Sequence, residues 1–91
     1  VPLQALYLMN SSFARQQAEA LMKRPEMAKA KGTEERIQTA FRLVYSRQPT
    51  KDELKLAREY VSVPGNEETV NRQWANFVQG LLIANEFVFV D

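Results

Sequence analysis

Three pairs of adjacent carboxylates are the residues of this sequence whose type could support chemistry. They are Glu34-Glu35, Asp52-Glu53 and Glu67-Glu68. Paired carboxylates serve as acid and base in glycoside hydrolysis, and carboxylates bind metal ions. Adjacent residues do not share a helix face, however, and each pair stands where a helix is predicted to start, where acids favour the helix dipole. We therefore interpret the pairs as helix-start residues and expect no glycosidase-like or di-metal site.

Histidine and cysteine are both absent from the 91 residues. This excludes a Ser-His-Asp triad, a cysteine nucleophile, disulfides and a Cys-x-x-Cys-His haem attachment within this chain. The commonest zinc ligands are missing as well. We expect no metal and no cofactor, and we find no catalytic constellation, which leaves open whether the whole protein is an enzyme.

Composition and charge indicate one small globular domain over residues 1–91, with 45% apolar residues and a net charge of +1. This charge gives no steering toward nucleic acid or a membrane, and no stretch approaches the ~20 apolar residues that span a bilayer. The densest cationic cluster is Lys23, Arg24, Lys29 and Lys31. We interpret this cluster as a solvated linker, with contact to an acidic polymer as the alternative.

Apolar periodicity predicts five helices joined by short connections. The first helix should follow Pro2, the second should run from Asn10-Ser11-Ser12 to a break at Pro25, and the third from a cap at Thr33 to about Ser46. The fourth should run from Thr50 to about Val63, and the fifth from Asn66 or Glu67 to about Asn85. A short basic turn should follow Pro25, with Gly32 as its stop. Thr50 and Glu53 have the spacing of a capping box.

Each of the last three helices has an apolar face, formed in the third helix by Ile37, Ala40, Phe41 and Val44. Leu54, Ala57, Tyr60 and Val61 form this face of the fourth helix. In the fifth helix, Trp74, Phe77 and Leu81 should lie at the centre of the core. Gly80 lies inside this helix at a cost of about 1 kcal/mol, which a close approach by another helix would explain.

The chain closes on an alternating apolar segment, residues 86–91, that is typical of extended structure. The sequence therefore predicts an all-α fold, a compact bundle of about five helices with an extended C-terminal tail. Leu3, Leu6, Leu8, Phe87 and Phe89 exceed what one small core covers, so we expect an apolar patch that contacts the rest of the protein or a partner.

Three segments resemble the motifs of a known family. Residues 2–10 resemble its TPLQALxLLN opening, residues 40–54 its AFRLxLGRxPTxxEL centre, and Trp74 with residues 81–91 its closing W…LLNSNEFLYVD. This is the planctomycete domain of unknown function that closes large, apparently exported proteins, often with a cytochrome-c-like module. The resemblance implies a C-terminal fragment of a longer chain, an exported or periplasmic location, and no established activity. Ser46 replaces the family's Gly, which disfavours a left-handed residue there.

Arg42, Arg47 and Glu86 match these motifs and are the candidates for a binding site. An arginine pairs bidentately with a carboxylate and so holds helix ends together. Glu86 stands where the fifth helix should end. We therefore expect Arg42 or Arg47 to bond Glu86 or a nearby backbone carbonyl as a structural contact, with ligand binding as the alternative.

The third and fourth helices with their basic link, residues 47–51, also resemble a helix-turn-helix. The fourth helix mixes charge signs, however, so we expect no binding of nucleic acid.

The sequence thus predicts a helical structural or interaction module of a large exported planctomycete-type protein, with the remainder of that chain as its partner. The alternatives are one wall of an enzyme active site completed by the parent chain and an acidic-glycan-binding module, and the oligomeric state is left open.

Overall fold

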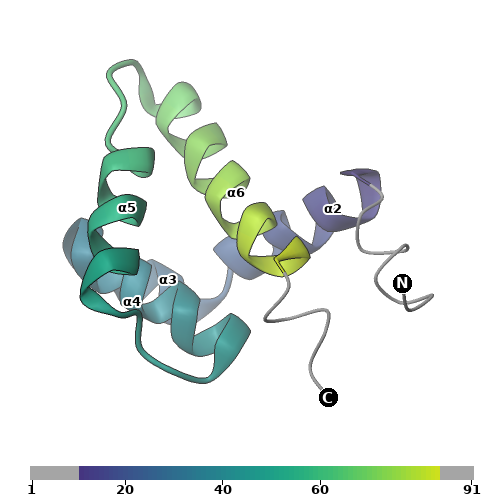
Figure 1. Cartoon of the computed structure of the whole chain (residues 1–91). Helices are drawn as coiled ribbons and strands as arrows, with labels where there is room; N and C mark the ends of the chain where they lie inside the picture. Colours follow the sequence, from purple (N-terminus) through teal and green to yellow (C-terminus); the bar gives the residue numbers. More distant parts are fainter. Residues whose placement is uncertain (1–10, 85–91) are drawn as a thin grey trace.

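A computed structural model describes residues 11–84, which form five α-helices and no strand. The helices are α2 (Ser11–Met22), α3 (Pro25–Lys29), α4 (Gly32–Tyr45), α5 (Lys51–Val61) and α6 (Glu67–Ile83) (Figure 1). The prediction of an all-α fold is confirmed. The helix expected after Pro2 and the tail expected over residues 86–91 lie outside the described residues.

The start of α5 carries the capping box that its sequence predicts, and α6 begins with a side-chain cap at Asn66. Thr50 Oγ1 accepts a hydrogen bond from the Glu53 N–H at 3.1 Å, and Glu53 Oε1 accepts one from the Thr50 N–H at 2.8 Å. Asn66 Oδ1 accepts the N–H of Thr69 at 2.9 Å. These side chains satisfy backbone donors that the first turn of a helix leaves without partners.

The start of α4 differs from the prediction, because Thr33 does not cap it. Gly32 has a φ of 86°, a left-handed conformation that turns the chain directly into the helix. The capping position falls on Lys31, which makes no side-chain cap. Its backbone N–H instead donates to Glu35 Oε2 at 2.7 Å. Gly32 therefore begins α4 instead of stopping the preceding segment.

Two further local features differ from the sequence reading. Pro25 is the first residue of a short helix, α3, where only a basic turn was expected; proline's fixed φ suits the first helical position. Ser46 is left-handed, with φ 59° and ψ 32°, although glycine is absent there. Its N–H donates to the carbonyl of Arg42 at 2.9 Å, which closes the last turn of α4.

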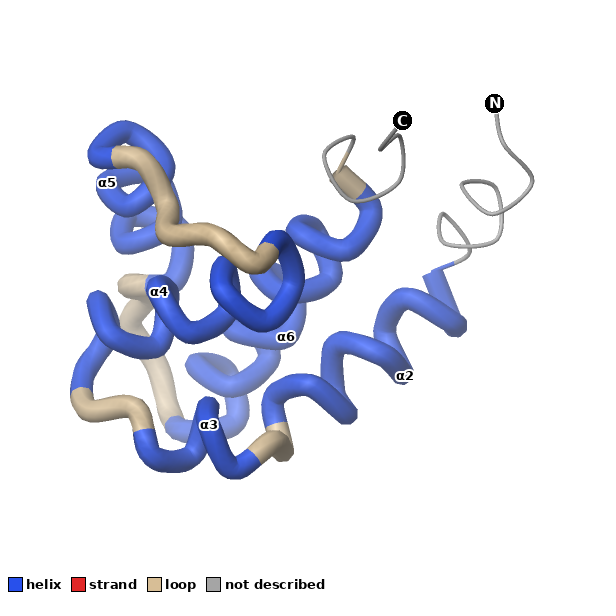
Figure 2. The backbone as a smooth tube through the Cα atoms, turned by 90° about the horizontal axis from the view of Figure 1, so that it is seen from below, coloured by secondary structure: helices blue, strands red, loops and turns tan. Residues whose placement is uncertain are grey.

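The core is centred on α6, which contacts α2, α4 and α5 (Figures 1 and 2). On the α2 side, Ala14 and Ala18 are fully buried, and their small size lets the two helices approach closely. Trp74 and Phe77 are buried as predicted, and their rings meet edge to face at 5.9 Å between centroids. Leu81 is only partly buried.

None of the helices within residues 11–84 makes the close approach expected at Gly80. A methyl group on Gly80 would meet no atom of residues 11–84 within 4 Å, and the residue is exposed. Gly80 is two residues from both Val78 and Leu82, which are buried. In a helix of 3.6 residues per turn, it therefore lies on the face opposite to the core.

Candidate functional site

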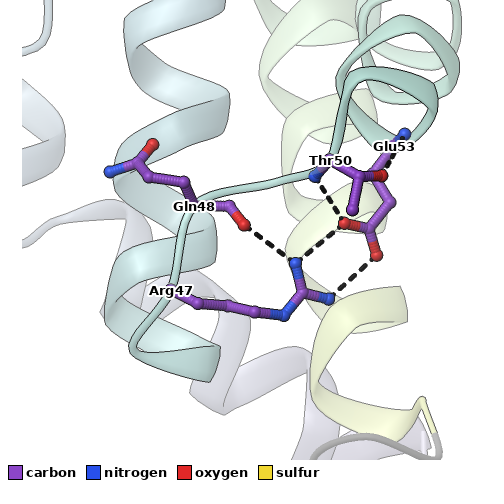
Figure 3. Close-up of polar contacts among 4 residues, drawn as sticks. All are labelled: Arg47, Gln48, Thr50 and Glu53. Atoms are coloured by element: carbon purple, nitrogen blue, oxygen red, sulfur yellow. Dashed lines mark hydrogen bonds and ion pairs between the residues drawn. The ribbon is translucent and has the colours of Figure 1, made fainter.

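Arg47 and Glu53 form a bidentate ion pair that fixes the connection between α4 and α5 (Figure 3). Arg47 Nη1 donates to Glu53 Oε1 at 2.8 Å, and Nη2 donates to Oε2 at 2.9 Å. The same Nη1 donates to the carbonyl of Gln48 at 2.8 Å. Since Glu53 also completes the capping box with Thr50, one carboxylate ties the link to the first turn of α5.

The electrostatics of this contact make Glu53 poorly suited to act as a general acid. The hydrogen bonds from Arg47 lower the pKa of Glu53 from 4.5 to about 2, against the opposing effect of desolvation. A general acid works best with a pKa near the ambient pH, and this carboxyl is ionised far below neutrality. The Arg47 guanidinium also lies 5.5 Å from the ring centroids of Phe41 and Tyr45.

The other candidate residues are dispersed. Arg42 is exposed in the last turn of α4, and Glu86 lies outside the described residues, so a contact between them stays a prediction. Glu34 pairs with Arg58 of α5, and Glu35 accepts the backbone N–H noted above. Within residues 11–84, no group of three or more His, Cys, Asp or Glu side chains is placed to hold a metal ion.

The basic segment Lys23–Lys31 is not only a linker, because it contains the helix α3, Pro25–Lys29. Met27, in the middle of the segment, is 2% exposed and belongs to the core. Arg24 pairs with Glu26 at 3.0 Å on the surface. Lys29 and Lys31 are exposed. The buried methionine, placed among the cations, accounts for the fixed position of α3.

An apolar groove of about 510 Å³ is bordered by α4, α5 and α6. Its lining includes the apolar side chains of Phe41, Tyr45, Leu56, Tyr60, Phe77 and Leu81. Tyr45 Oη donates to the carbonyl of Leu81 at 2.7 Å, which joins α4 to α6 beside the groove. Among the described residues that line the groove, Glu53 alone is charged, and its charge is paired with Arg47. The groove thus suits an apolar occupant.

Two side chains on the α5 wall are conspicuously exposed for their size. Leu56 is 65% exposed and Tyr60 is 46% exposed. Tyr60, predicted on the apolar face of this helix, is exposed, whereas Ala57 and Val61 of the same face are buried. Leu56 is a large apolar residue that lies outside the predicted apolar face of α5. Its position is the feature of the sequence that could have indicated the groove wall.

A second concavity, between α2, α4 and α6, has a different character, since four cationic side chains line it. None of the residues that line it also lines the apolar groove. None of the described helices is long and apolar enough to cross a membrane.

Comparison with known proteins gives a family and no activity. The model of the family PSD1, described as a protein of unknown function (DUF1553), matches residues 1–61. This segment includes α2 to α5 and therefore the α4 and α5 walls of the groove. No curated protein and no solved structure matches the chain.

Proposed function

Since this chain belongs to the PSD1 family of proteins of unknown function (DUF1553), we propose that it is a helical interaction module of a larger protein. Its partner is the remainder of that protein. The three motif resemblances favour a large exported protein of planctomycete type as the parent, located outside the cytoplasm or in the periplasm. The residues of this domain supply contacts and no chemistry.

The observation that carries this proposal is the exposure of Leu56 and Tyr60 on the wall of the apolar groove. Large apolar side chains that border a concave apolar surface are typical of binding sites. A groove between helices accepts an amphipathic helix, which inserts its apolar face. Because Arg47 already compensates the charge of Glu53, the occupant needs no cation at this position. We therefore propose an amphipathic segment of the parent chain as the occupant.

Site-specific crosslinking in the full-length parent protein tests this assignment. A photoreactive phenylalanine analogue replaces Tyr60, and a matched control carries it at Ile83, which is 36% exposed and does not line the groove. Mass spectrometry then maps the crosslinked peptides. We expect position 60, and not position 83, to crosslink to a segment of the parent outside residues 1–91.

Two results would contradict the proposal. Crosslinks from position 60 confined to residues 85–91, which follow directly on the groove residue Ala84, would assign the groove to the domain's own tail. Equal crosslinking from both positions would indicate nonspecific contact. As a second measurement, Leu56→Gln should increase protease cleavage of the parent segment that crosslinks, whereas Ile83→Gln should not.

A further inference from the structure

The concavity between α2, α4 and α6 has a volume of about 680 Å³ and collects charge from four separate segments. Arg15 of α2, Lys23 after α2, Arg36 of α4 and Arg72 of α6 line it. These are four of the twelve Lys and Arg residues of a chain whose net charge is only +1. Like charges repel one another, so a negatively charged group bound in this concavity would be favoured.

The acids in the same lining do not supply this compensation. Glu19 and Glu68 also line the concavity, so two acids stand against four cations and the lining has a net charge of +2. The ion pairs formed among residues 11–84 are Arg24–Glu26, Arg47–Glu53 and Arg58–Glu34, none of which includes a residue of this lining. Arg15 donates to the neutral side chain of Asn76.

Arg36 is the most informative of the four cations. Its guanidinium carbon lies 4.4 Å from the centroid of the Trp74 ring, which holds the group in place without neutralising it. Its Nε is buried and has no hydrogen-bond partner among the described residues. Burial lowers the pKa of Arg36 by desolvation, yet a guanidinium stays charged in proteins. A buried polar group of this kind normally has a partner.

We propose that this concavity binds a tetrahedral oxyanion, a phosphate or sulfate group carried on a small organic ligand. Arg36 provides a guanidinium held in place by Trp74, while Arg15, Arg72 and Lys23 contribute charge from the surrounding segments. Guanidinium groups match the geometry of such oxyanions by donating two hydrogen bonds at once. The volume falls within the range of small-molecule sites, and Met22 and Ala75 offer apolar lining for the organic part. This site is separate from the apolar groove, and so it does not depend on the docking proposal.

Trp74 is the only tryptophan of the chain and reports directly on Arg36. The full chain is titrated with sodium phosphate and sodium sulfate against sodium chloride of equal ionic strength, while Trp74 fluorescence is recorded. We expect a saturable change with phosphate and sulfate and none with chloride. Calorimetry of the same titrations gives the dissociation constants independently of the fluorescence.

Charge-removing variants locate the site. Arg36→Gln should abolish the fluorescence change, and Arg72→Gln, at an exposed position that tolerates substitution, should weaken binding about tenfold through the loss of one charged hydrogen bond. Lys55→Gln, at an exposed lysine outside the concavity, is the matched control and should bind like the parent protein. Circular dichroism checks that each variant is folded. If Arg36→Gln does not fold, the binding affinity of Arg72→Gln tests the location of the site.

Glucose 6-phosphate and glucose 6-sulfate distinguish the two sources of the oxyanion. Because the chain has no histidine, binding of the phosphate ester should strengthen from roughly pH 5.5 to pH 7.5 as the ester gains its second charge, and binding of the sulfate ester should stay level. The ester that binds more tightly than its inorganic ion identifies the ligand class. The proposal is overturned if no saturable binding occurs below ~10 mM, if Lys55→Gln weakens binding as much as Arg72→Gln, or if neither ester exceeds the inorganic ions.

Discussion

Replacing Glu53 with Gln removes the charge that joins the α4–α5 link to the first turn of α5 and nearly preserves the size of the side chain. A glutamine in this position of a capping box still accepts the backbone N–H of Thr50. The substitution therefore acts mainly on the bidentate contact with Arg47, whose two hydrogen bonds are 2.8 and 2.9 Å long.

The size of the effect follows from the pKa of Glu53. A fall from 4.5 to about 2 corresponds to about 3.4 kcal/mol at about 1.36 kcal/mol per pH unit. The side chains of Arg47 and Glu53 are 34% and 35% exposed, so solvent screens the interaction. We therefore discount this figure and expect Glu53→Gln to lower the free energy of unfolding by about 1–1.5 kcal/mol at neutral pH.

The pH dependence has a definite sign. The pKa of Glu53 is lower in the folded state, so its contribution is complete above pH 4.5 and is lost as the pH falls toward 2. Urea unfolding, followed by Trp74 fluorescence at several pH values, measures this loss. The difference in free energy of unfolding between the parent protein and Glu53→Gln should shrink across this window.

Glu59→Gln provides the matched control, since Glu59 is an exposed acid on the same helix outside any ion pair among residues 11–84. We expect it to change the free energy of unfolding by less than about 0.5 kcal/mol. The reasoning is refuted if Glu53→Gln and Glu59→Gln are equally stable at neutral pH, or if the difference between Glu53→Gln and the parent protein persists undiminished at about pH 2.

Three other substitutions test helix ends and the core by the same urea unfolding. Asn66→Ala should cost about 1 kcal/mol because it removes the cap on Thr69 N–H, whereas Asn66→Asp should retain stability; equal loss in both would refute the cap. Met27→Ala should cost about 2–4 kcal/mol, since Met27 is 2% exposed, and a smaller loss than Met22→Ala would contradict its place in the core. Ser46→Gly should raise the free energy of unfolding by about 0.5–1 kcal/mol, because glycine adopts a φ of 59° without strain. Ser62→Gly should bring no such gain, because φ is −85° there.

The features that the sequence predicts correctly are local. The capping box of Thr50 and Glu53 depends on residues within three positions, so spacing alone identifies it. The burial of Trp74 and Phe77 follows from helical periodicity, which places both on one face. Each of these predictions needs no knowledge of the partner helix.

The features that the sequence misses depend on the tertiary arrangement. Whether Tyr60 is buried or forms a groove wall depends on how far α6 covers α5, and periodicity does not carry that information. The contact of Arg36 with Trp74 joins α4 to α6, and no pattern in the sequence indicates that these two residues meet. The left-handed Ser46 shows that closure of the last turn of α4 outweighs the preference for glycine at that position.

The packing of α2 against α6 also sets an order on folding during synthesis. α4 and α5 adjoin in sequence and can associate early, whereas α2 contacts α6 only after residues 23–66 have been added. The entropy cost of closing a loop rises with its length, and distant contacts form late. The face of α2 that contains Ala14 and Ala18 therefore lacks its main cover until translation passes Ile83. The segment that matches the family, residues 1–61, thus lacks α6 and does not form the complete core by itself.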